Sequence, residues 1–251
     1  MDVVDLRDFY ASPLGGSVQR LLARALQQRL QPKSDELVLG LGFASPYLDV
    51  LVPQNNVSLS FMMARQGVIH WPQGEMVRSA LVDEYDLPLL ESVADHVVVV
   101  HGLEQAELPL DMLQEIWRVM APQGKLYLVV PNRRGLWAAS DASPFGSGQP
   151  FSRSQIANLL KDARFSATWW QEALVMPPFP APALLKSAMA VERIGQKLAS
   201  RFSGVIVVEA VKQVYAFSSG KRARRLVPRF RPLLLPRPAG GSTTKQMDEP
   251  S

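Results

Sequence analysis

The sequence predicts a three-layer α/β domain, in which helices cover both faces of a mostly parallel sheet. Short apolar runs alternate along the chain with stretches whose apolar residues recur every three or four positions. The clearest apolar run, Ala94–Val100, ends in four consecutive valines, which is typical of a strand buried on both faces. The alternation continues to residue 217, so we expect one domain over residues 1–218.

Each predicted element has a local reason in the sequence. Residues 17–30 place leucines at helical spacing after a Pro-Leu-Gly-Gly turn at 13–16, and residues 110–120 repeat this spacing before Pro122. A third helix is predicted over 152–163, with the Ser152 hydroxyl as its N-cap. A brief helix is expected at 47–51. The other predicted strands cover residues 36–41, 57–62, 79–83, 125–130, 165–174 and 205–217.

The composition excludes several classes of site. Apolar residues make up 47% and charged residues 20% of the chain, as in a folded globular domain. No cysteine is present, which excludes disulfides, thiolate metal sites and a cysteine nucleophile. With three histidines in the whole sequence, we expect no metal site. The acidic start, Met1-Asp2-Val3-Val4-Asp5, does not resemble a secretory signal, so a cytoplasmic location is expected.

The net charge of +4 is unevenly distributed. Residues from Gly220 onward carry a net charge of +6, which leaves the rest of the chain slightly acidic. We expect residues 219–251 to be a basic Pro- and Arg-rich tail without a fixed fold, either solvated or in contact with anionic lipid or RNA. An amphipathic helical insertion is expected at about 182–202. The apolar face of this helix, over residues 184–202, either packs on the domain or binds a partner protein.

A glycine-containing turn follows the first predicted strand. Gly40 and Gly42 stand in the segment Gly40-Leu41-Gly42-Phe43-Ala44. Glycines at the carboxyl end of a strand let a ligand come close to the backbone. The same pattern is also found in an ordinary tight turn, so both interpretations stay open on this segment alone.

Further motifs follow in a fixed order between residues 83 and 126. These are Asp83-Glu84-Tyr85-Asp86-Leu87-Pro88, an aspartate at 95, His101-Gly102-Leu103-Glu104, and Glu115-Ile116-Trp117-Arg118-Val119-Met120-Ala121-Pro122-Gln123-Gly124. Together with Pro150-Phe151-Ser152-Arg153-Ser154-Gln155-Ile156, they resemble the class I S-adenosylmethionine-dependent methyltransferases, of the methyltransferase type 11 kind, over about residues 36–170.

The resemblance implies a Rossmann-like three-layer sandwich with a seven-stranded, mostly parallel sheet and S-adenosylmethionine as the cofactor. By position, Gly40 and Gly42 would approach its methionine and ribose part. Asp83, with the backbone of Glu84, would meet the adenine amino group, and His101 and Gly102 would lie beside the sulfonium. Methyl transfer from a sulfonium depends mainly on orientation, which fits a site with few acid–base groups. No catalytic residue can be assigned.

Two acidic residues of the family pattern are missing. Val38 stands where the family has an acid before the first glycine, and residues 59–63 contain none. Each loss removes a charge-assisted hydrogen bond worth about 1.5–3 kcal/mol. Ser60, Gln66 or backbone groups would have to replace these contacts in a methyltransferase that acts on a small or medium-sized acceptor. The alternative is a non-catalytic protein of this fold that serves as a partner-binding subunit or scaffold.

Four residues are candidates for contacts with the acceptor. His70, beside Trp71, either walls the adenine, presents a base to the acceptor or belongs to a packed corner. Arg133 and Arg134 follow a strand at the pocket side, where they would clamp a carboxylate or phosphate unless they are solvated. Tyr10 would close over the cofactor or pack in the core. Glu104, by contrast, is expected with Glu107 and Asp111 on an acidic face that is either solvated or caps the helix that follows.

Overall fold

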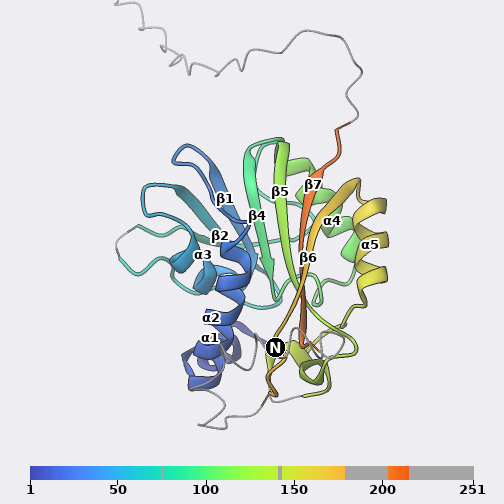
Figure 1. Ribbon diagram of the computed structural model, residues 1–251. Coiled ribbons are helices and arrows are strands. Elements are labelled where there is room, and N and C mark those ends of the chain that lie inside the picture. The colour runs from blue at the N-terminus through green and yellow to red at the C-terminus, as the bar shows by residue number, and fades with distance from the viewer. Residues whose placement is uncertain (75, 141–142, 179–202, 215–251) are drawn as a thin grey trace, which may run out of the picture. The chain divides into compact units, whose positions relative to one another are not determined.

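The computed structural model describes residues 1–74, 76–140, 143–178 and 203–214 of the chain (Figure 1). Its strands form one seven-stranded sheet in the order β3-β2-β1-β4-β5-β7-β6. The strands are β1 (Leu37–Gly42), β2 (Val57–Met63), β3 (Ser79–Val82), β4 (Ala94–Val100), β5 (Met120–Pro131), β6 (Phe165–Ala173) and β7 (Val205–Lys212).

The sheet is mostly parallel, as the sequence predicts. Strands β1 to β5 pair in parallel, whereas β7 runs antiparallel to both β5 and β6. The helices are α1 (Val3–Ala11), α2 (Pro13–Gln27), α3 (Ser45–Leu51), α4 (Pro109–Val119) and α5 (Arg153–Asp162), with short 3-10 turns η1 (Leu136–Ala139) and η2 (Pro144–Gly146). In Figure 1, α2 and α3 cover one face of the sheet and α4 and α5 the other.

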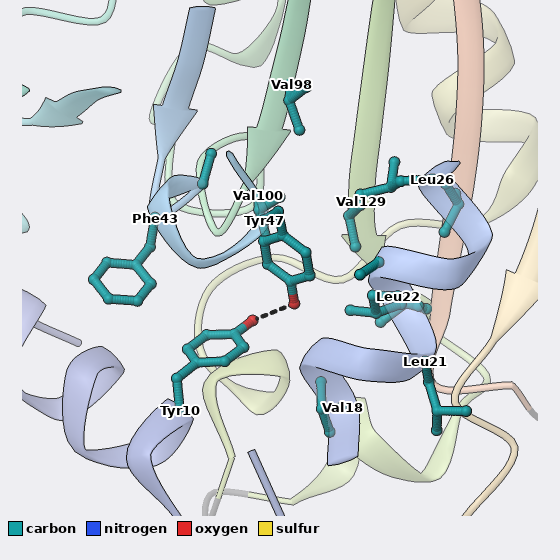
Figure 2. Packing of buried hydrophobic residues seen from close by; sticks show 14 of the residues in the cluster. Tyr10, Val18, Leu21, Leu22, Leu26, Phe43, Tyr47, Val98, Val100 and Val129 are labelled. Carbon is teal, nitrogen blue, oxygen red and sulfur yellow. Dashed lines mark hydrogen bonds between the residues drawn. The ribbon is translucent and has the colours of Figure 1, made fainter. Parts of the chain in front are cut away.

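The four valines of β4 show why this strand is apolar throughout. Val98 and Val100 belong to the hydrophobic core beneath α2 and α3, which Figure 2 shows from close by. Val97 and Val99 belong to the second core, beneath α4 and α5. All four side chains are fully buried. The interpretation of this run as a central strand buried on both faces is therefore confirmed.

The amino-terminal region differs from the prediction. The expected turn at 13–16 is the first turn of α2, because the Ser12 hydroxyl accepts a hydrogen bond from Gly15 N at 3.0 Å and Pro13 needs no backbone donor there. A Cβ atom at Gly15 would lie 2.0 Å from the Phe9 carbonyl oxygen. Glycine is therefore needed for the close crossing of α1 and α2, not for a turn.

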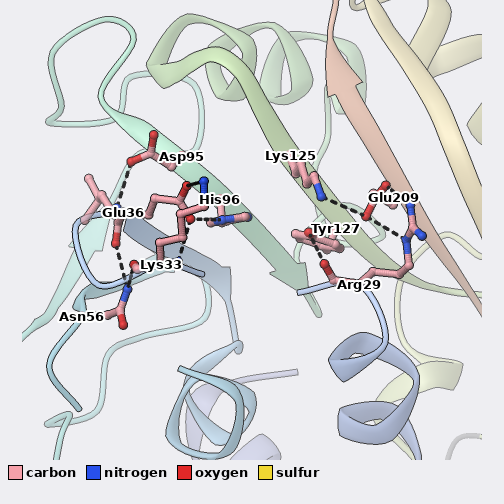
Figure 3. Close-up of polar contacts among 10 residues, drawn as sticks. Arg29, Lys33, Glu36, Asn56, Asp95, His96, Lys125, Tyr127 and Glu209 are labelled. Carbon is pink, nitrogen blue, oxygen red and sulfur yellow. Dashed lines mark hydrogen bonds and ion pairs between the residues drawn. The ribbon is translucent and has the colours of Figure 1, made fainter. Parts of the chain in front are cut away.

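A polar network lines the amino ends of the parallel strands (Figure 3). Arg29 donates two hydrogen bonds to the Glu209 carboxylate, at 3.1 and 2.8 Å, and the Tyr127 hydroxyl donates to the Arg29 carbonyl oxygen at 3.0 Å. Nearby, the His96 Nε2 atom lies 3.0 Å from the Glu36 carboxylate. Side chains that would be costly to bury alone are thus paired at this edge.

The predicted helical insertion at 182–202 and the basic tail at 219–251 lie outside the described residues. Among the described residues, no helix has the length and apolar character that crossing a membrane requires.

Candidate functional site

The strand order creates a topological switch point between β1 and β4. From β1 the chain proceeds outward through β2 to β3, and from β4 it proceeds in the opposite direction to β5. In parallel sheets of this kind, ligands bind in the crevice at the carboxyl ends of the two strands that flank the switch point. Here Gly42 at the end of β1 is paired with Val100 at the end of β4. We call the position of Gly42, His101 and Gly102, at the carboxyl ends of these two strands, the switch-point crevice.

Gly42 has a backbone conformation that favours glycine, with φ of +78°. A Cβ atom at this position would lie 2.4 Å from the Val100 carbonyl oxygen and 3.0 Å from the Gly102 Cα atom. The next residue, Phe43, donates its backbone N–H to the same Val100 oxygen at 2.7 Å. The turn after β1 therefore lies directly against the end of β4, and this brings together Gly42, His101 and Gly102, as the sequence predicts.

Gly40 has a different reason to be glycine. A Cβ atom there would lie 2.8 Å from the side chains of both Ala44 and Leu48. These residues belong to α3 and the turn before it. In this structure Gly40 allows α3 to pack closely on β1, and its side-chain position faces a helix.

His101 is the polar centre of the crevice. It is 1% exposed and has φ of +51°, which is uncommon for a residue other than glycine. Its Nε2 atom lies 2.8 Å from the hydroxyl of Tyr10, which comes from α1. The Tyr10 hydroxyl also lies 2.8 Å from the Tyr47 hydroxyl, as Figure 2 shows. The Tyr10 ring stacks on Phe43 with the ring centroids 5.6 Å apart.

Both phenols are held in the protonated state. Burial raises the pKa of Tyr10 well above its ordinary value, and the neighbouring Tyr47 raises it further. Burial likewise raises the pKa of Tyr47, although its hydrogen bond with Tyr10 acts in the opposite direction. Tyr10, Tyr47 and His101 therefore form a buried chain of hydrogen bonds in which the tyrosines carry no charge near neutral pH.

Glu104 lies behind His101 and is buried, with 2% of its surface exposed. One carboxylate oxygen is 3.3 Å from His101 Nδ1, but the two atoms are not aligned as a hydrogen bond, and neither Glu104 oxygen has a hydrogen-bond partner among the described residues. The prediction that Glu104 lies on a solvated acidic face is wrong. The turn at 101–104 directs its side chain inward, against the His101 ring.

Gln66 reaches the crevice from the loop after β2. Its side-chain Nε2 atom donates to the His101 carbonyl oxygen, and its own backbone carbonyl accepts a hydrogen bond from Val3 N at 2.7 Å. The side chain is 4% exposed. Gln66 thus joins the end of β4, the loop after β2 and the start of α1. Ser60, the other predicted replacement for a missing acid, is fully buried within β2.

The two acidic residues after β3 have different surroundings. Asp83 is exposed, and its Oδ1 atom accepts a hydrogen bond from Tyr85 N at 2.9 Å. Glu84 is buried and forms an ion pair with Arg65 at 2.9 Å. Arg65 also pairs with Glu107 at 3.2 Å. Arg65 was not predicted as part of the site, because its partners Glu84 and Glu107 are distant in the sequence.

The remaining predicted acceptor contacts lie apart from this chain of hydrogen bonds. His70 is exposed, while its neighbour Trp71 is buried and donates its indole N–H to Asp49 at 2.8 Å. Arg133 and Arg134 are both exposed. Arg133 donates to the Pro150 carbonyl oxygen at 3.3 Å, and Arg134 lines a surface cavity of about 200 Å³. Across the described residues, no group of three metal-ligating side chains comes together.

Comparisons with known proteins agree with this architecture. Residues 41–128 match the family described as "Methyltransferase domain". No curated protein matches the sequence. The similar solved structures described next are 14–20% identical to this chain, so they show the fold alone.

One similar structure is a chain from the complex between the Haloferax volcanii Trm112 methyltransferase activator and a methyltransferase, at 18% identity and a TM-score of 0.58, covering 83% of this chain and 96% of that one. Another is the [4+2]-cyclase SpnF, at 20% identity and a TM-score of 0.52. The match covers 78% of this chain and 81% of the cyclase chain. A third is the geranyl diphosphate C-methyltransferase of Streptomyces coelicolor, at 14% identity and a TM-score of 0.52. The match covers 76% of this chain and 77% of that chain.

Proposed function

We propose that this chain is a class I S-adenosylmethionine-dependent methyltransferase, which binds S-adenosylmethionine at the switch-point crevice and methylates a small or medium-sized acceptor. The observation that carries this proposal is the convergence of Gly42, His101 and Gly102 at the carboxyl ends of β1 and β4. When bound, the cofactor supplies an electrophilic methyl group.

The polar groups of the crevice fit a ligand that carries positive charge. S-adenosylmethionine has a sulfonium and an ammonium group. Both Glu104 carboxylate oxygens are buried without a hydrogen-bond partner among the described residues. A buried carboxylate of this kind favours a nearby cation, because it is poorly compensated in a medium of low dielectric constant.

The residues of the chain have distinct roles in this proposal. Gly42 and Gly102 allow the turn after β1 to lie against the end of β4, and the buried Tyr10 and Tyr47 exclude water. Asp83 uses Oδ1 for its own turn, and we assign Oδ2 to the adenine amino group. Glu84 is engaged with Arg65, so it contributes through its backbone. We assign Arg134, beside its surface cavity, to the acceptor, with Arg133 and His70 as further candidates.

A second function is favoured by two specific observations. The side chains of Tyr10 and Gln66 fill the crevice, and Val38 in β1 offers no carboxylate to a ligand. A non-catalytic protein of this fold that binds a partner would show the same features. One similar chain forms a complex with the Trm112 activator, and another similar protein is a cyclase, so the fold alone does not fix the activity.

Isothermal titration calorimetry of the full chain with S-adenosylmethionine and S-adenosylhomocysteine distinguishes the two functions. A methyltransferase binds both ligands saturably. Asp83→Ala should then weaken binding about tenfold or more, since a hydrogen bond to an amino group is lost. Absence of heat at millimolar ligand would favour the partner-binding function instead.

A matched pair of glycine variants tests the location of the site. Gly42→Ala should abolish binding, because the added methyl group collides with the Val100 carbonyl oxygen. Gly16→Ala is the control, since the nearest atom to its Cβ position is the end of the Arg20 side chain at 3.7 Å. Thermal unfolding of both variants establishes whether they are folded. If Gly42→Ala is folded and binds normally, the cofactor does not lie at this turn.

The acceptor can be sought with a labelled methyl group. The full chain is incubated with S-adenosylmethionine labelled in the methyl group and with cell extract separated by size. Our proposal predicts label in the small-molecule fraction. Label in a macromolecular fraction would contradict the acceptor class while leaving the cofactor assignment intact. A cytoplasmic location, expected from the sequence, stays a prediction.

A further inference from the structure

The connection between β2 and β3 differs from the usual link between parallel strands, which is a helix that crosses one face of the sheet. This connection covers residues 64–78, and its described residues, 64–74 and 76–78, contain no helix. A cavity of about 350 Å³ is lined by this connection, by α3 with the turn that follows it, and by the amino end of β2. We call it the α3 cavity. It is distinct from the switch-point crevice, which lies at the carboxyl ends of β1 and β4.

Two opposite charges line the α3 cavity without pairing. Asp49, in α3, is exposed, and its Oδ1 atom accepts the indole N–H of Trp71 at 2.8 Å. Arg78, just before β3, is half-buried and donates a long hydrogen bond, of 3.5 Å, to the Asn56 carbonyl oxygen. Neither charged side chain forms an ion pair with the other or with any further residue that the structure describes. The Asp49 Oδ2 atom and the other guanidinium donors of Arg78 are therefore available to a ligand.

The rest of the lining is partly polar and partly apolar. Ser58, in β2, is 6% exposed, and its hydroxyl has no hydrogen-bond partner in the described part of the chain. A buried hydroxyl of this kind favours a ligand that supplies the missing partner. Leu48 and Val52 from α3 and Pro72 from the connection form an apolar wall. The cavity thus offers two separate charges of opposite sign, a hydroxyl and apolar surface.

We propose that the α3 cavity binds a small zwitterion of the α-amino acid class. The ammonium group pairs with Asp49, the carboxylate pairs with Arg78, and the ligand side chain lies against the apolar wall. A ligand with one charge would leave the other residue uncompensated, so the pair selects for a zwitterion. The volume is at the lower end of the range for small-molecule sites, about 300–1,000 Å³, and this suits an amino acid. The inference is independent of the cofactor at the switch-point crevice.

Binding is tested on the full chain with the free proteinogenic amino acids as probes. Each is added at millimolar concentration, the amino acids are ranked by the rise in melting temperature, and the strongest is titrated by calorimetry. Its methyl ester lacks the carboxylate charge, and its N-acetyl derivative lacks the ammonium charge. We expect each derivative to bind about tenfold or more weakly, because a charge-assisted hydrogen bond is lost.

Two variants remove the charges of the protein one at a time. Asp49→Asn keeps an oxygen that can accept the Trp71 indole N–H, and Arg78→Gln leaves the backbone unchanged. Each should weaken binding about tenfold or more. The matched controls are Asp111→Asn in α4 and Arg7→Gln in α1, two exposed residues outside the lining of this cavity, which should bind as the wild type does. Thermal unfolding without ligand establishes whether each variant is folded.

The location of binding is measured without any variant. The Trp71 indole N–H donates to Asp49 at the cavity, whereas the Trp137 indole N–H is buried and donates to the Met176 carbonyl oxygen at 2.6 Å. In an NMR titration of the ¹⁵N-labelled chain, the Trp71 indole signal should shift saturably with the amino acid. The Trp137 indole signal should stay in place.

The results separate clearly. Saturable binding of an amino acid that shifts the Trp71 signal and is weakened in both derivatives and both cavity variants supports the proposal. Absence of binding by every amino acid at millimolar concentration overturns it. Binding that leaves the Trp71 signal unchanged, or that persists equally in the derivatives or in folded Asp49→Asn and Arg78→Gln chains, also overturns it. None of these outcomes depends on whether the chain binds S-adenosylmethionine.

Discussion

The Tyr10 hydroxyl lies 2.8 Å from His101 Nε2, although 91 positions separate the two residues in the sequence. Tyr10 belongs to the first helix and His101 follows the central strand β4. The contact connects the start of the chain to the topological switch point of the sheet. Three predictions about this region and about the opposite edge follow from the surrounding contacts.

Tyr10 and Tyr47 should be energetically coupled, because their hydroxyls form one buried hydrogen bond. Tyr47→Phe in the wild-type chain should lower the free energy of unfolding by about 0.5–1.5 kcal/mol. In a chain that already carries Tyr10→Phe, the Tyr47 hydroxyl has lost this partner, so the same substitution should cost little or stabilise the fold. Urea unfolding of the four chains gives the coupling. Equal effects of Tyr47→Phe in both backgrounds would contradict the role of this bond.

Asp2 should set the stability of α1. Its Oδ1 atom accepts hydrogen bonds from Val4 N and Asp5 N, both at 2.9 Å, and forms a capping box with Asp5. Asp2→Ala should destabilise the helix by about 0.5–2 kcal/mol and increase hydrogen exchange there. Ser152→Ala, which removes the cap of α5, is the control and should leave exchange in α1 unchanged. The assignment fails if α1 exchanges alike in Asp2→Ala and the wild type.

Glu209 should make the fold sensitive to acid. Burial alone would raise the pKa of this carboxyl group, but hydrogen bonds from Arg29 and Thr168 outweigh it and lower the pKa below its ordinary value. Because the folded-state pKa lies below the unfolded-state pKa, the stabilisation is present above the unfolded value, about pH 4.3 for glutamate. It is lost as the pH falls through the folded-state value.

Urea unfolding at pH 7 and at pH 3 measures this contribution. The wild type should lose free energy of unfolding between these pH values, and Glu209→Gln should lose less. The pKa of Glu36 is also lowered: burial alone would raise it, but the Lys33 backbone N–H and His96 outweigh that effect, so Glu36→Gln serves as a parallel variant. If Glu209→Gln shows the full pH dependence of the wild type, the acid sensitivity arises from other groups.

Local patterns predicted the sheet well. The bounds predicted for β4, Ala94–Val100, agree with the structure, because a strand buried on both faces must be apolar at every position. Helix α1 was not predicted, since it is 9 residues long and its burial depends on Gln66 and Phe145, which lie far along the chain. The turn expected at 13–16 shows the same limit, because the reason for Gly15 is the neighbouring carbonyl of Phe9.

The candidate site was predictable in part. Gly42, His101 and Gly102 follow strands whose carboxyl ends meet, so topology alone brings them together. The inward direction of Glu104 and the pairing of Glu84 with Arg65 depend on loop conformation and on distant partners. Sequence spacing carries no signal for either contact. For the same reason, the reach of Gln66 across to the His101 carbonyl oxygen was not predicted.

The most direct test of the central claim is an NMR titration of the full, ¹⁵N-labelled chain with S-adenosylhomocysteine, in which the backbone amides of Gly42 and Gly102 are followed. Both amides lie at the switch point, and the amide of Gly16, in α2, serves as the internal reference. We predict saturable shifts at Gly42 and Gly102 with little change at Gly16. Signals that stay unchanged at both crevice glycines up to millimolar ligand would contradict a cofactor site between β1 and β4.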